Sequence, residues 1–192
     1  MRVVAGRLRS RAIDAPKGGA TRPTSDRVRE SLFAVLGDVT GARVLDLYAG
    51  SGALAIEALS RGAARAVLVE VARPALAAIG KNLAALGLVE VARVVQRRVG
   101  QAASAVMAEA PFDLVLIDPP YADLPSGALA RELATLLAEP GLLASDARVV
   151  VEHAARDAAP ALAGLALVDE RRWGDSRVAF YARAEAGAAE PA

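Results

Sequence analysis

Asp118, Pro119, Pro120 and Tyr121 directly follow the apolar run "DLVLI", whose length and composition are typical of a strand buried on both faces. Proline cannot pair inside a sheet, so the prolines must lie just beyond the end of that strand. Both prolines lack an N–H group, and the turn therefore offers carbonyl oxygens and the Asp118 carboxylate with few competing donors. Acceptors of this kind suit an exocyclic amine, and Tyr121 can stack on a base taken out of its helix. The alternative is a rigid turn that merely ends the strand.

A glycine loop in "LDLYAGSGALAIEAL" is the second group with chemical potential. Gly50, Ser51 and Gly52 stand between a predicted strand and a predicted helix, where glycines permit a tight turn and close approach to a ligand. The spacing fits the dinucleotide pattern G-x-G-x-x-A, which also occurs in purely structural turns. Glu70, at the end of the next predicted strand, can accept hydrogen bonds from two ribose hydroxyls. This fits NAD and S-adenosylmethionine equally well.

Asp46 distinguishes between these two cofactors, because it lies inside the strand that leads into the glycine loop. A fixed carboxylate beside a pyrophosphate would repel it by ~1 kcal/mol or more at close range. The sulfonium and ammonium groups of S-adenosylmethionine would instead be attracted. The alternative is a purely structural role, in which Asp46 only caps its own loop. We therefore expect S-adenosylmethionine as the cofactor, bound by Asp46, Tyr48, Glu70 and the glycine loop.

Strand and helix patterns alternate along most of the chain and must position these residues. Such alternation predicts an α/β fold with a mostly parallel sheet and right-handed crossovers. The end differs, since two strands around the short turn "GDS" predict a hairpin with an antiparallel last strand. The expected strands are 43–48, 66–70, 92–96, 113–117, 148–153, 165–173 and 177–184, and the expected helices are 52–62, 73–87, 100–110, 126–138 and one that starts at residue 24.

Composition excludes several classes of protein. The chain has 192 residues with 54% hydrophobic content, no cysteine and one histidine. A disulfide framework and a thiolate metal site are impossible, and we expect no bound metal. No apolar run approaches the ~18 residues of a membrane span, and the N-terminus lacks the apolar segment of a signal peptide. We expect a cytoplasmic protein without a membrane partner, with a monomer as the default state.

The first thirty residues carry eight Arg and Lys side chains against three Asp and Glu, a net +5, whereas the whole chain carries +1. A basic arm on a near-neutral body suggests a polyanionic partner, with a merely solvated extension as the alternative. Residues 1–20 are predicted to form a basic hairpin extension, 21–183 the main domain and 184–192 a disordered tail. In a hairpin, Arg7, Arg9 and Arg11 would share one face and contact RNA phosphates, together with Arg27 and Arg29.

The chain resembles the RsmD family, bacterial methyltransferases that modify N2 of one guanine in 16S ribosomal RNA. The resemblance runs from about residue 2 to residue 182 and is most specific in "TRPTSDRVRESLF", "VLDLYAGSGALAIEALSRGA" and "DLVLIDPPY". It implies a Rossmann-like class I methyltransferase fold, with a seven-stranded sheet, and 16S rRNA in the small ribosomal subunit as the partner. It further implies that Arg22, Thr24 and Asp26 help to close the methionine end of the cofactor pocket.

Two features depart from the family pattern. Related enzymes often carry an aspartate after the third strand that contacts the adenine amine, whereas this chain has Gln96, Arg97 and Arg98 there. Trp173 stands where relatives tend to have tyrosine, and we interpret it, like His153, as a packing residue. Adenine recognition must therefore come from backbone groups or from another side chain.

Other functions remain open at the level of the sequence. An amino-methyltransferase of DNA adenine or protein glutamine shares the "DPPY" logic. Guanine offers two adjacent donors, N1–H and N2–H₂, which suit the two acceptors of a carboxylate, but adenine enzymes with aspartate at this position also exist. A non-catalytic RNA-binding module is disfavoured by the intact motifs, and an NAD-dependent oxidoreductase by Asp46.

Overall fold

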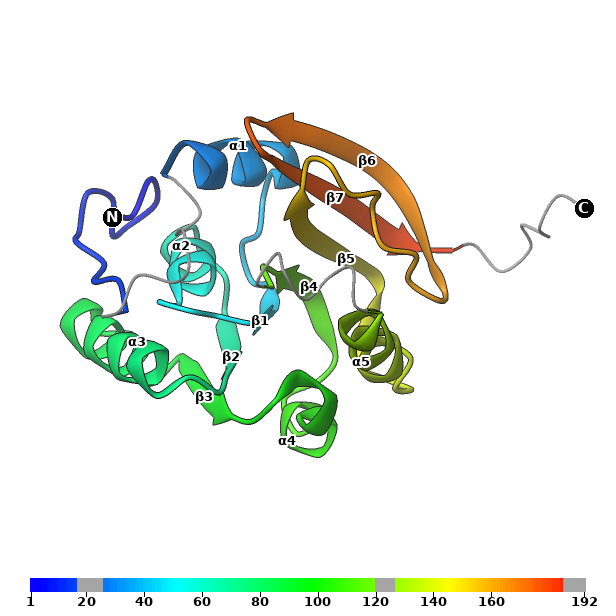
Figure 1. The fold of residues 1–192 in the computed structure, drawn as a ribbon. Coiled ribbons are helices and arrows are strands. Elements are labelled where there is room, and N and C mark those ends of the chain that lie inside the picture. The colour runs from blue at the N-terminus through cyan, green and yellow to red at the C-terminus, as the bar shows by residue number, and fades with distance from the viewer. Residues whose placement is uncertain (17–25, 120–126, 185–192) are drawn as a thin grey trace, which may run out of the picture.

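The computed structural model describes residues 1–16, 26–119 and 127–184, which form a single α/β layer structure (Figure 1). Its centre is a seven-stranded sheet in the order β3-β2-β1-β4-β5-β7-β6. The strands are β1 (Arg43–Leu47), β2 (Arg65–Glu70), β3 (Ala92–Gln96), β4 (Phe112–Ile117), β5 (Leu143–Ala154), β6 (Leu165–Trp173) and β7 (Ser176–Arg183). The helices are α1 (Asp26–Leu36), α2 (Ala53–Ser60), α3 (Arg73–Leu86), α4 (Ala103–Met107) and α5 (Ala128–Leu137), with a 3₁₀ turn, η1 (Val99–Gln101).

The direction of the strands agrees with the sequence-based expectation. Strands β1 to β5 pair in parallel, and β7 runs antiparallel to both of its neighbours, β5 and β6. The strand order reverses between β1 and β4, because the chain builds outward to β3 and then returns to the other side of β1. In open α/β sheets, ligands bind at such a reversal, beyond the carboxyl ends of the strands. The fold therefore directs attention to the ends of β1 and β4.

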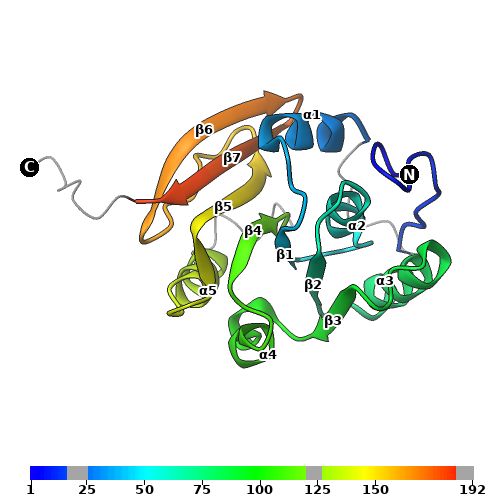
Figure 2. The same cartoon turned by 180° about the vertical axis from the view of Figure 1, so that it is seen from behind.

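Alternate side chains of the strands enter two separate cores. Leu114 and Leu116 of β4 pack with α1, α2 and α3 on one face, whereas Val115 and Ile117 pack with α4 and α5 on the other. Figures 1 and 2 show these two helix layers on opposite faces of the sheet. Burial on both faces explains why the β4 sequence is continuously apolar rather than alternating.

Two elements differ in length from the prediction. The helix expected over 100–110 is split into η1 and the five-residue α4, and Gly100 lies in η1, where a bulkier residue would meet Glu132 of α5. Strand β5 begins at Leu143, five residues before the predicted start, and its pairing with β4 shifts between Phe112 and Leu114. The first part of the strand was not predicted, because Ser145 and Asp146 interrupt the apolar pattern there.

The predicted N-terminal hairpin is irregular and contains no extended strands. Residues 1–14 form turns with only one isolated bridge, between Arg2 and Ala12. The two ends of the segment still pair through backbone bonds, from the Val3 N–H to the Arg11 carbonyl at 2.9 Å and from the Ile13 N–H to the Met1 carbonyl at 3.0 Å. The N–H groups between them donate partly to α2, as described below, so no regular strand ladder forms. Among the described residues the longest helix is α3, with 14 residues, and none of the described helices is long and apolar enough to cross a membrane.

Candidate cofactor and methyl-transfer site

Three carboxylates gather where the strand order reverses. In the sheet register Asp46 of β1 lies opposite Leu68 of β2 and Leu116 of β4. Glu70 and Asp118 each come two residues after those partners, so they flank the end of β1 from both sides. The electrostatic effect of both carboxylates on Asp46 agrees with this proximity. The predicted cofactor acids and the predicted catalytic acid therefore share one edge of the sheet.

The glycine loop turns sharply after β1. Tyr48, Gly50 and Gly52 all have positive φ, at 61°, 57° and 78° respectively. For a tyrosine this conformation costs ~1–3 kcal/mol and is found mainly at functional sites. It lets the Ala49 N–H donate to the Val69 carbonyl of β2 at 3.1 Å, which bends the loop across the end of the sheet.

The two glycines are needed for different reasons. A Cβ on Gly52 would meet Leu68 Cδ2 at 3.0 Å, so this glycine permits close packing of α2 on β2. Among the described residues, a Cβ on Gly50 would meet only the Tyr48 carbonyl oxygen, at 3.9 Å. Gly50 is therefore the position at which a ligand can approach the backbone closely.

Glu70 holds the glycine loop to the end of β2. Its Oε2 accepts the Gly50 N–H at 2.9 Å, while Oε1 accepts the Val71 and Ala72 N–H groups at 2.6 and 2.8 Å. An ionised carboxylate has about four acceptor sites, so three are already in use. In this structure Glu70 can accept one further hydroxyl, rather than the two expected from the sequence.

Asp46 is an unusually placed acid. It is 1% exposed, its Oδ2 accepts the Ala55 N–H at 3.1 Å, and its Oδ1 is buried without a hydrogen-bond partner in the described part of the chain. Burial raises the pKa of Asp46 to about 8, and the negative charges of Asp118 and Glu70 add to the effect. A buried carboxylate oxygen without a partner fits a cationic ligand, because a nearby positive charge would stabilise the ionised form.

The end of β4 supplies the acceptors predicted to bind an amine. Asp118 is partly buried and Pro119 is buried, and the Asp118 N–H approaches the Leu47 carbonyl oxygen at 3.5 Å. This contact ties the turn after β4 to the end of β1. Pro120 and Tyr121, the other residues predicted to be catalytic, lie outside the described residues.

Helix α1 corrects one prediction. The expectation that Arg29 binds RNA is wrong, because this side chain is fully buried. Its guanidinium donates to Asp26 Oδ1 at 2.7 Å and to the Arg2 carbonyl at 2.6 Å, and it approaches Met1 Sδ. It is an internal clamp rather than a surface contact, and it occupies one oxygen of Asp26. Arg27 is exposed, as an RNA contact requires. Arg22 and Thr24 lie outside the described residues.

Two polar residues of α2 anchor the N-terminal segment and were missed from the sequence. Buried Glu57 accepts the Val4 and Ala5 N–H groups at 2.8 and 2.9 Å and pairs with Arg61. Ser60 accepts the Leu8 N–H at 3.0 Å. The signal was present in the sequence, since both residues interrupt an otherwise apolar helix.

A third missed residue, Asn82 of α3, links the N-terminal segment to the glycine loop. Its Nδ2 donates to the carbonyl oxygens of Ser51 and Asp14, both at 3.0 Å, and its Oδ1 accepts the Asp14 N–H at 2.9 Å. The Ser51 hydroxyl in turn approaches Met1 Sδ at 3.7 Å. The N-terminal segment thus supports the loop that is predicted to hold the cofactor.

The arginines of the N-terminal segment lie beside the C-terminal ends of α2 and α3. Arg7, Arg9 and Arg11 are exposed. However, the Arg7 N–H donates to the Ser60 carbonyl at the end of α2, and the Arg11 guanidinium to the Ala85 carbonyl near the end of α3. Helix α2 runs from the carboxyl edge of the sheet to its amino edge, so Arg7 lies at the amino edge, whereas Arg11 lies beside the last turn of α3. Their predicted RNA contacts remain untested.

His153 and Trp173 have packing environments, as expected. His153 is fully buried between the Ala154 carbonyl and Glu170 Oε1, both at 3.2 Å. Trp173 packs against the core that contains α1, α2 and α3. Within the described residues there is no cluster of three or more His, Asp or Glu side chains suited to hold a metal ion.

Comparison with known proteins connects this geometry to a family. The family model described as Conserved hypothetical protein 95 matches residues 1–182. Ribosomal RNA small subunit methyltransferase D of Escherichia coli (strain K12) is 37% identical over 191 residues, which cover 97% of this chain and 92% of that protein. The solved structure of a hypothetical protein of Thermus thermophilus is 32% identical, with a TM-score of 0.77 and coverage of 94% of this chain and 98% of that one.

A more distant structure has the same fold. An RNA methyltransferase from Salinibacter ruber, solved in complex with S-adenosyl-L-homocysteine, is 19% identical with a TM-score of 0.65, and the match covers 85% of this chain and 95% of that one. The sheet order described above is thus the α/β architecture of S-adenosylmethionine-dependent methyltransferases. Because the family model covers nearly the whole chain and full-length relatives exceed 30% identity, this protein belongs to the RsmD family.

Proposed function

We propose that this protein is an S-adenosylmethionine-dependent methyltransferase that modifies the exocyclic N2 amine of a guanine in 16S ribosomal RNA. The observation that carries the proposal is the meeting of Asp46, Glu70 and Asp118 at the reversal of the strand order. Two of these acids face the loop that follows β1, and the third ends β4. A ribosomal substrate would place the enzyme in the cytoplasm, with the small ribosomal subunit as its partner.

The cofactor is S-adenosylmethionine, which supplies an electrophilic methyl group on a cationic sulfonium. Asp46 matches this charge, because its Oδ1 is buried without a partner in the described residues and its carboxyl group otherwise retains a proton. NAD carries a pyrophosphate, which three carboxylates at this edge would repel. The lack of a side chain at Gly50 lets the cofactor approach the backbone of the glycine loop. Glu70 retains one acceptor site for a ribose hydroxyl.

Asp118 and the Pro119 carbonyl are the residues assigned to the amine. Guanine presents N1–H and N2–H₂ as adjacent donors, and a carboxylate can accept from both. These contacts fix the orientation of the nitrogen and raise its electron density. Once N2 has gained the methyl group it carries one proton too many, and Asp118 can accept that proton and pass it to water. The rest of the catalysis is positioning and exclusion of water.

The relatives support the choice of substrate. The Escherichia coli relative is named for methylation of small-subunit ribosomal RNA, and its similarity covers the whole site region of this chain. That name specifies neither the base nor the atom. The assignment to guanine N2 rests on the carboxylate acceptor at position 118 and on the family resemblance of "DLVLIDPPY".

The test uses ribosomal RNA from cells in which the gene has been deleted. Purified protein and S-adenosylmethionine should convert one guanosine of the 16S RNA to N2-methylguanosine, detected by nucleoside mass spectrometry and located by primer extension. RNA from cells that retain the gene is the control and should accept no methyl group. Methylation of an adenine in DNA, or of a glutamine, in place of the guanine would refute the assigned substrate while preserving the cofactor.

A further inference from the structure

We infer that Arg73, Arg97 and Arg98 bind backbone phosphates of the RNA substrate; we call them the rim arginines. The inference rests on the proposed function and adds the surface on which the RNA lies. It replaces the N-terminal segment, Arg7, Arg9 and Arg11, as the main electrostatic contact.

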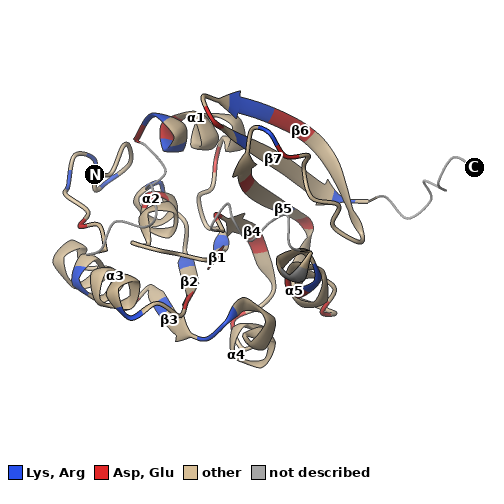
Figure 3. Ribbon diagram, in the orientation of Figure 1, with Lys and Arg blue, Asp and Glu red and all other residues tan. Residues whose placement is uncertain are grey.

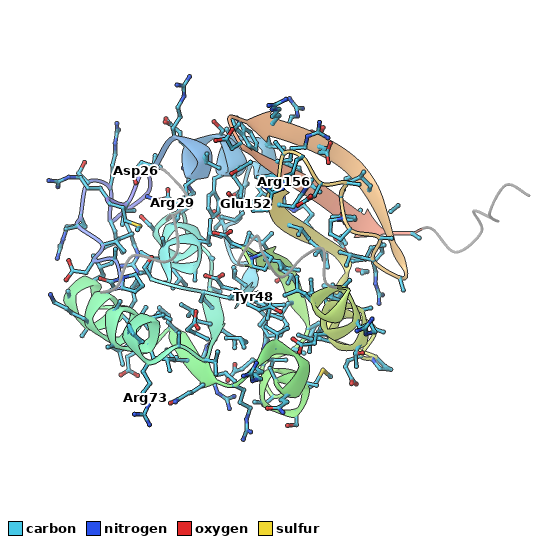
Figure 4. All side chains as sticks on the ribbon, viewed as in Figure 1. Asp26, Arg29, Tyr48, Arg73, Glu152 and Arg156 are labelled. Atoms are coloured by element: carbon cyan, nitrogen blue, oxygen red, sulfur yellow. The ribbon has the colours of Figure 1, made fainter. Side chains whose placement is uncertain are left out.

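The position of the rim arginines follows from the sheet register. Glu70, the last residue of β2, pairs with Gln96, the last residue of β3. Arg97 and Arg98 come directly after Gln96, and Arg73 begins α3 three residues after Glu70. Adjacent strands are ~4.8 Å apart, so the three side chains start from neighbouring points on the carboxyl edge. Figure 4 shows Arg73 extending outward from α3, and Figure 3 shows the basic stretch between β3 and α4.

The positive charge of the rim arginines is not neutralised by the protein. All three are exposed, and none of their guanidinium groups has a carboxylate or other hydrogen-bond partner among the described residues. Some exposed cations are paired with acids, as in Lys81–Asp14, Arg93–Glu109 and Arg171–Asp169, whereas the rim arginines, like Arg7 and Arg9, are not. The neighbouring acid, Glu70, is already held by three backbone N–H groups. Three guanidinium groups without acidic partners form a surface that attracts a polyanion.

The cofactor does not account for this charge. Its adenosine moiety is neutral, and its only anionic group, the methionine carboxylate, is at the other end of the molecule, so three arginines beside the adenosine gain nothing electrostatically. RNA phosphates supply the missing negative charge. Strands β2 and β1 separate β3 from β4, so the rim lies roughly 10–15 Å from Asp118 at ~4.8 Å per strand. A strand whose target base has left the stack to reach Asp118 would pass this rim within a few nucleotides.

The N-terminal arginines are less well placed. Arg7 lies beyond the end of α2, which spans ~12 Å from the glycine loop at 1.5 Å per residue, and the Arg11 guanidinium reaches the last turn of α3. Arg7 is therefore at the opposite edge of the sheet from Asp118. This gives a matched control, because both sets consist of three exposed arginines whose removal changes the net charge equally.

The experiment compares two triple variants, Arg73→Ala/Arg97→Ala/Arg98→Ala and Arg7→Ala/Arg9→Ala/Arg11→Ala. Binding to 16S ribosomal RNA from deletion cells is measured at several salt concentrations, and S-adenosylmethionine affinity is measured by calorimetry. The rim variant should lose at least tenfold in RNA affinity at low salt. Its slope of log affinity against log salt should flatten by roughly two to three units, at ~0.7–0.9 per phosphate contact. Its cofactor affinity should stay within about twofold, and Arg→Lys at the three positions should restore most of the slope.

Other results would overturn the inference. A slope that is unchanged in the rim variant and flattened in the control variant would return RNA binding to the N-terminal segment. Lost cofactor affinity with an unchanged slope would assign the rim arginines to the adenosine site. The proposed function fails separately, and visibly, if the wild-type protein does not methylate this RNA. If the wild type does methylate it and the rim variant matches it at every salt concentration, only the inference is wrong.

Discussion

Replacing Asp46 with Asn should stabilise the protein without cofactor, and by an amount that depends on pH. The wild-type carboxyl group has a pKa of about 8 in the folded state, against 3.8 for an ordinary aspartate. Above pH 4 the unfolded chain loses this proton while the folded protein keeps it. Ionisation therefore favours the unfolded state, and the stability of the wild type falls as pH rises towards 8. Asparagine cannot ionise, so the variant escapes this loss.

The expected size follows from the two pKa values. Each pH unit between them contributes about 1.4 kcal/mol, so the advantage of Asp46→Asn should grow from near zero at pH 4 to an upper limit of about 5–6 kcal/mol at pH 8. Above pH 8 it should stay constant. The variant keeps a side-chain oxygen that can accept the Ala55 N–H, so that bond does not change the comparison.

Urea unfolding of both proteins at a series of pH values measures this difference directly. Subtracting the two free energies of unfolding cancels the contributions of all other titrating groups. The reasoning is refuted if the difference is the same at pH 5 and pH 8, because Asp46 would then have an ordinary pKa in the folded protein. A difference of the opposite sign would mean that the ionised form is the one that the fold stabilises.

Further predictions concern cofactor binding, methyl transfer and the packing of the N-terminal segment. Wild-type protein should release close to one proton on binding S-adenosylmethionine near pH 6.5, seen by calorimetry in two buffers, and Asp46→Asn should release none. Glu70→Ala should weaken S-adenosylmethionine by ~1–3 kcal/mol, and NAD should give no heat with either protein; equal cofactor affinities would remove Glu70 from the site. Asp118→Ala should abolish methyl transfer with cofactor affinity within a few-fold, whereas Asp118→Asn should keep some activity; a wild-type rate in Asp118→Ala would disprove its role. Gly6→Ala should lower the free energy of unfolding, measured in urea, by well over 1 kcal/mol, because the new Cβ would lie 1.9 Å from the Ser60 carbonyl oxygen. Gly37 has a similar φ and no described neighbour within 4 Å, so Gly37→Ala should cost only the ~1 kcal/mol of backbone strain. Equal losses in the two variants would contradict the close contact at Gly6.

The sheet and its site were predictable because each depends on local patterns. Continuous apolar runs such as "DLVLI" locate buried parallel strands, and the acids and glycines that follow them then share one edge by topology. The proximity of Asp46, Glu70 and Asp118 could thus be predicted from the sequence. The strand Ala92–Gln96 was predicted with its observed bounds.

The errors arose where distant partners override local patterns. The first fourteen residues alternate like a hairpin, but Glu57 and Ser60 accept three of the N–H groups near its turn, so the pairing stays irregular. Arg29 looks like a surface cation until the Arg2 carbonyl and Met1 are placed against it. No local signal specifies such contacts, because their partners are 27 to 53 residues away in the chain.

The docking of the N-terminal segment also has a consequence during synthesis. Residues 1–14 are made before α2 and α3, and Asp14 must wait for Asn82, which is 68 residues further along the chain. At roughly 5–20 residues per second, this delay lasts several seconds, during which Val3, Leu8 and Ile13 have no core to enter. Charged residues beside an exposed apolar stretch oppose aggregation. We therefore expect the arginines interspersed there, at positions 7, 9 and 11, to protect the nascent chain from aggregation until α2 and α3 have folded.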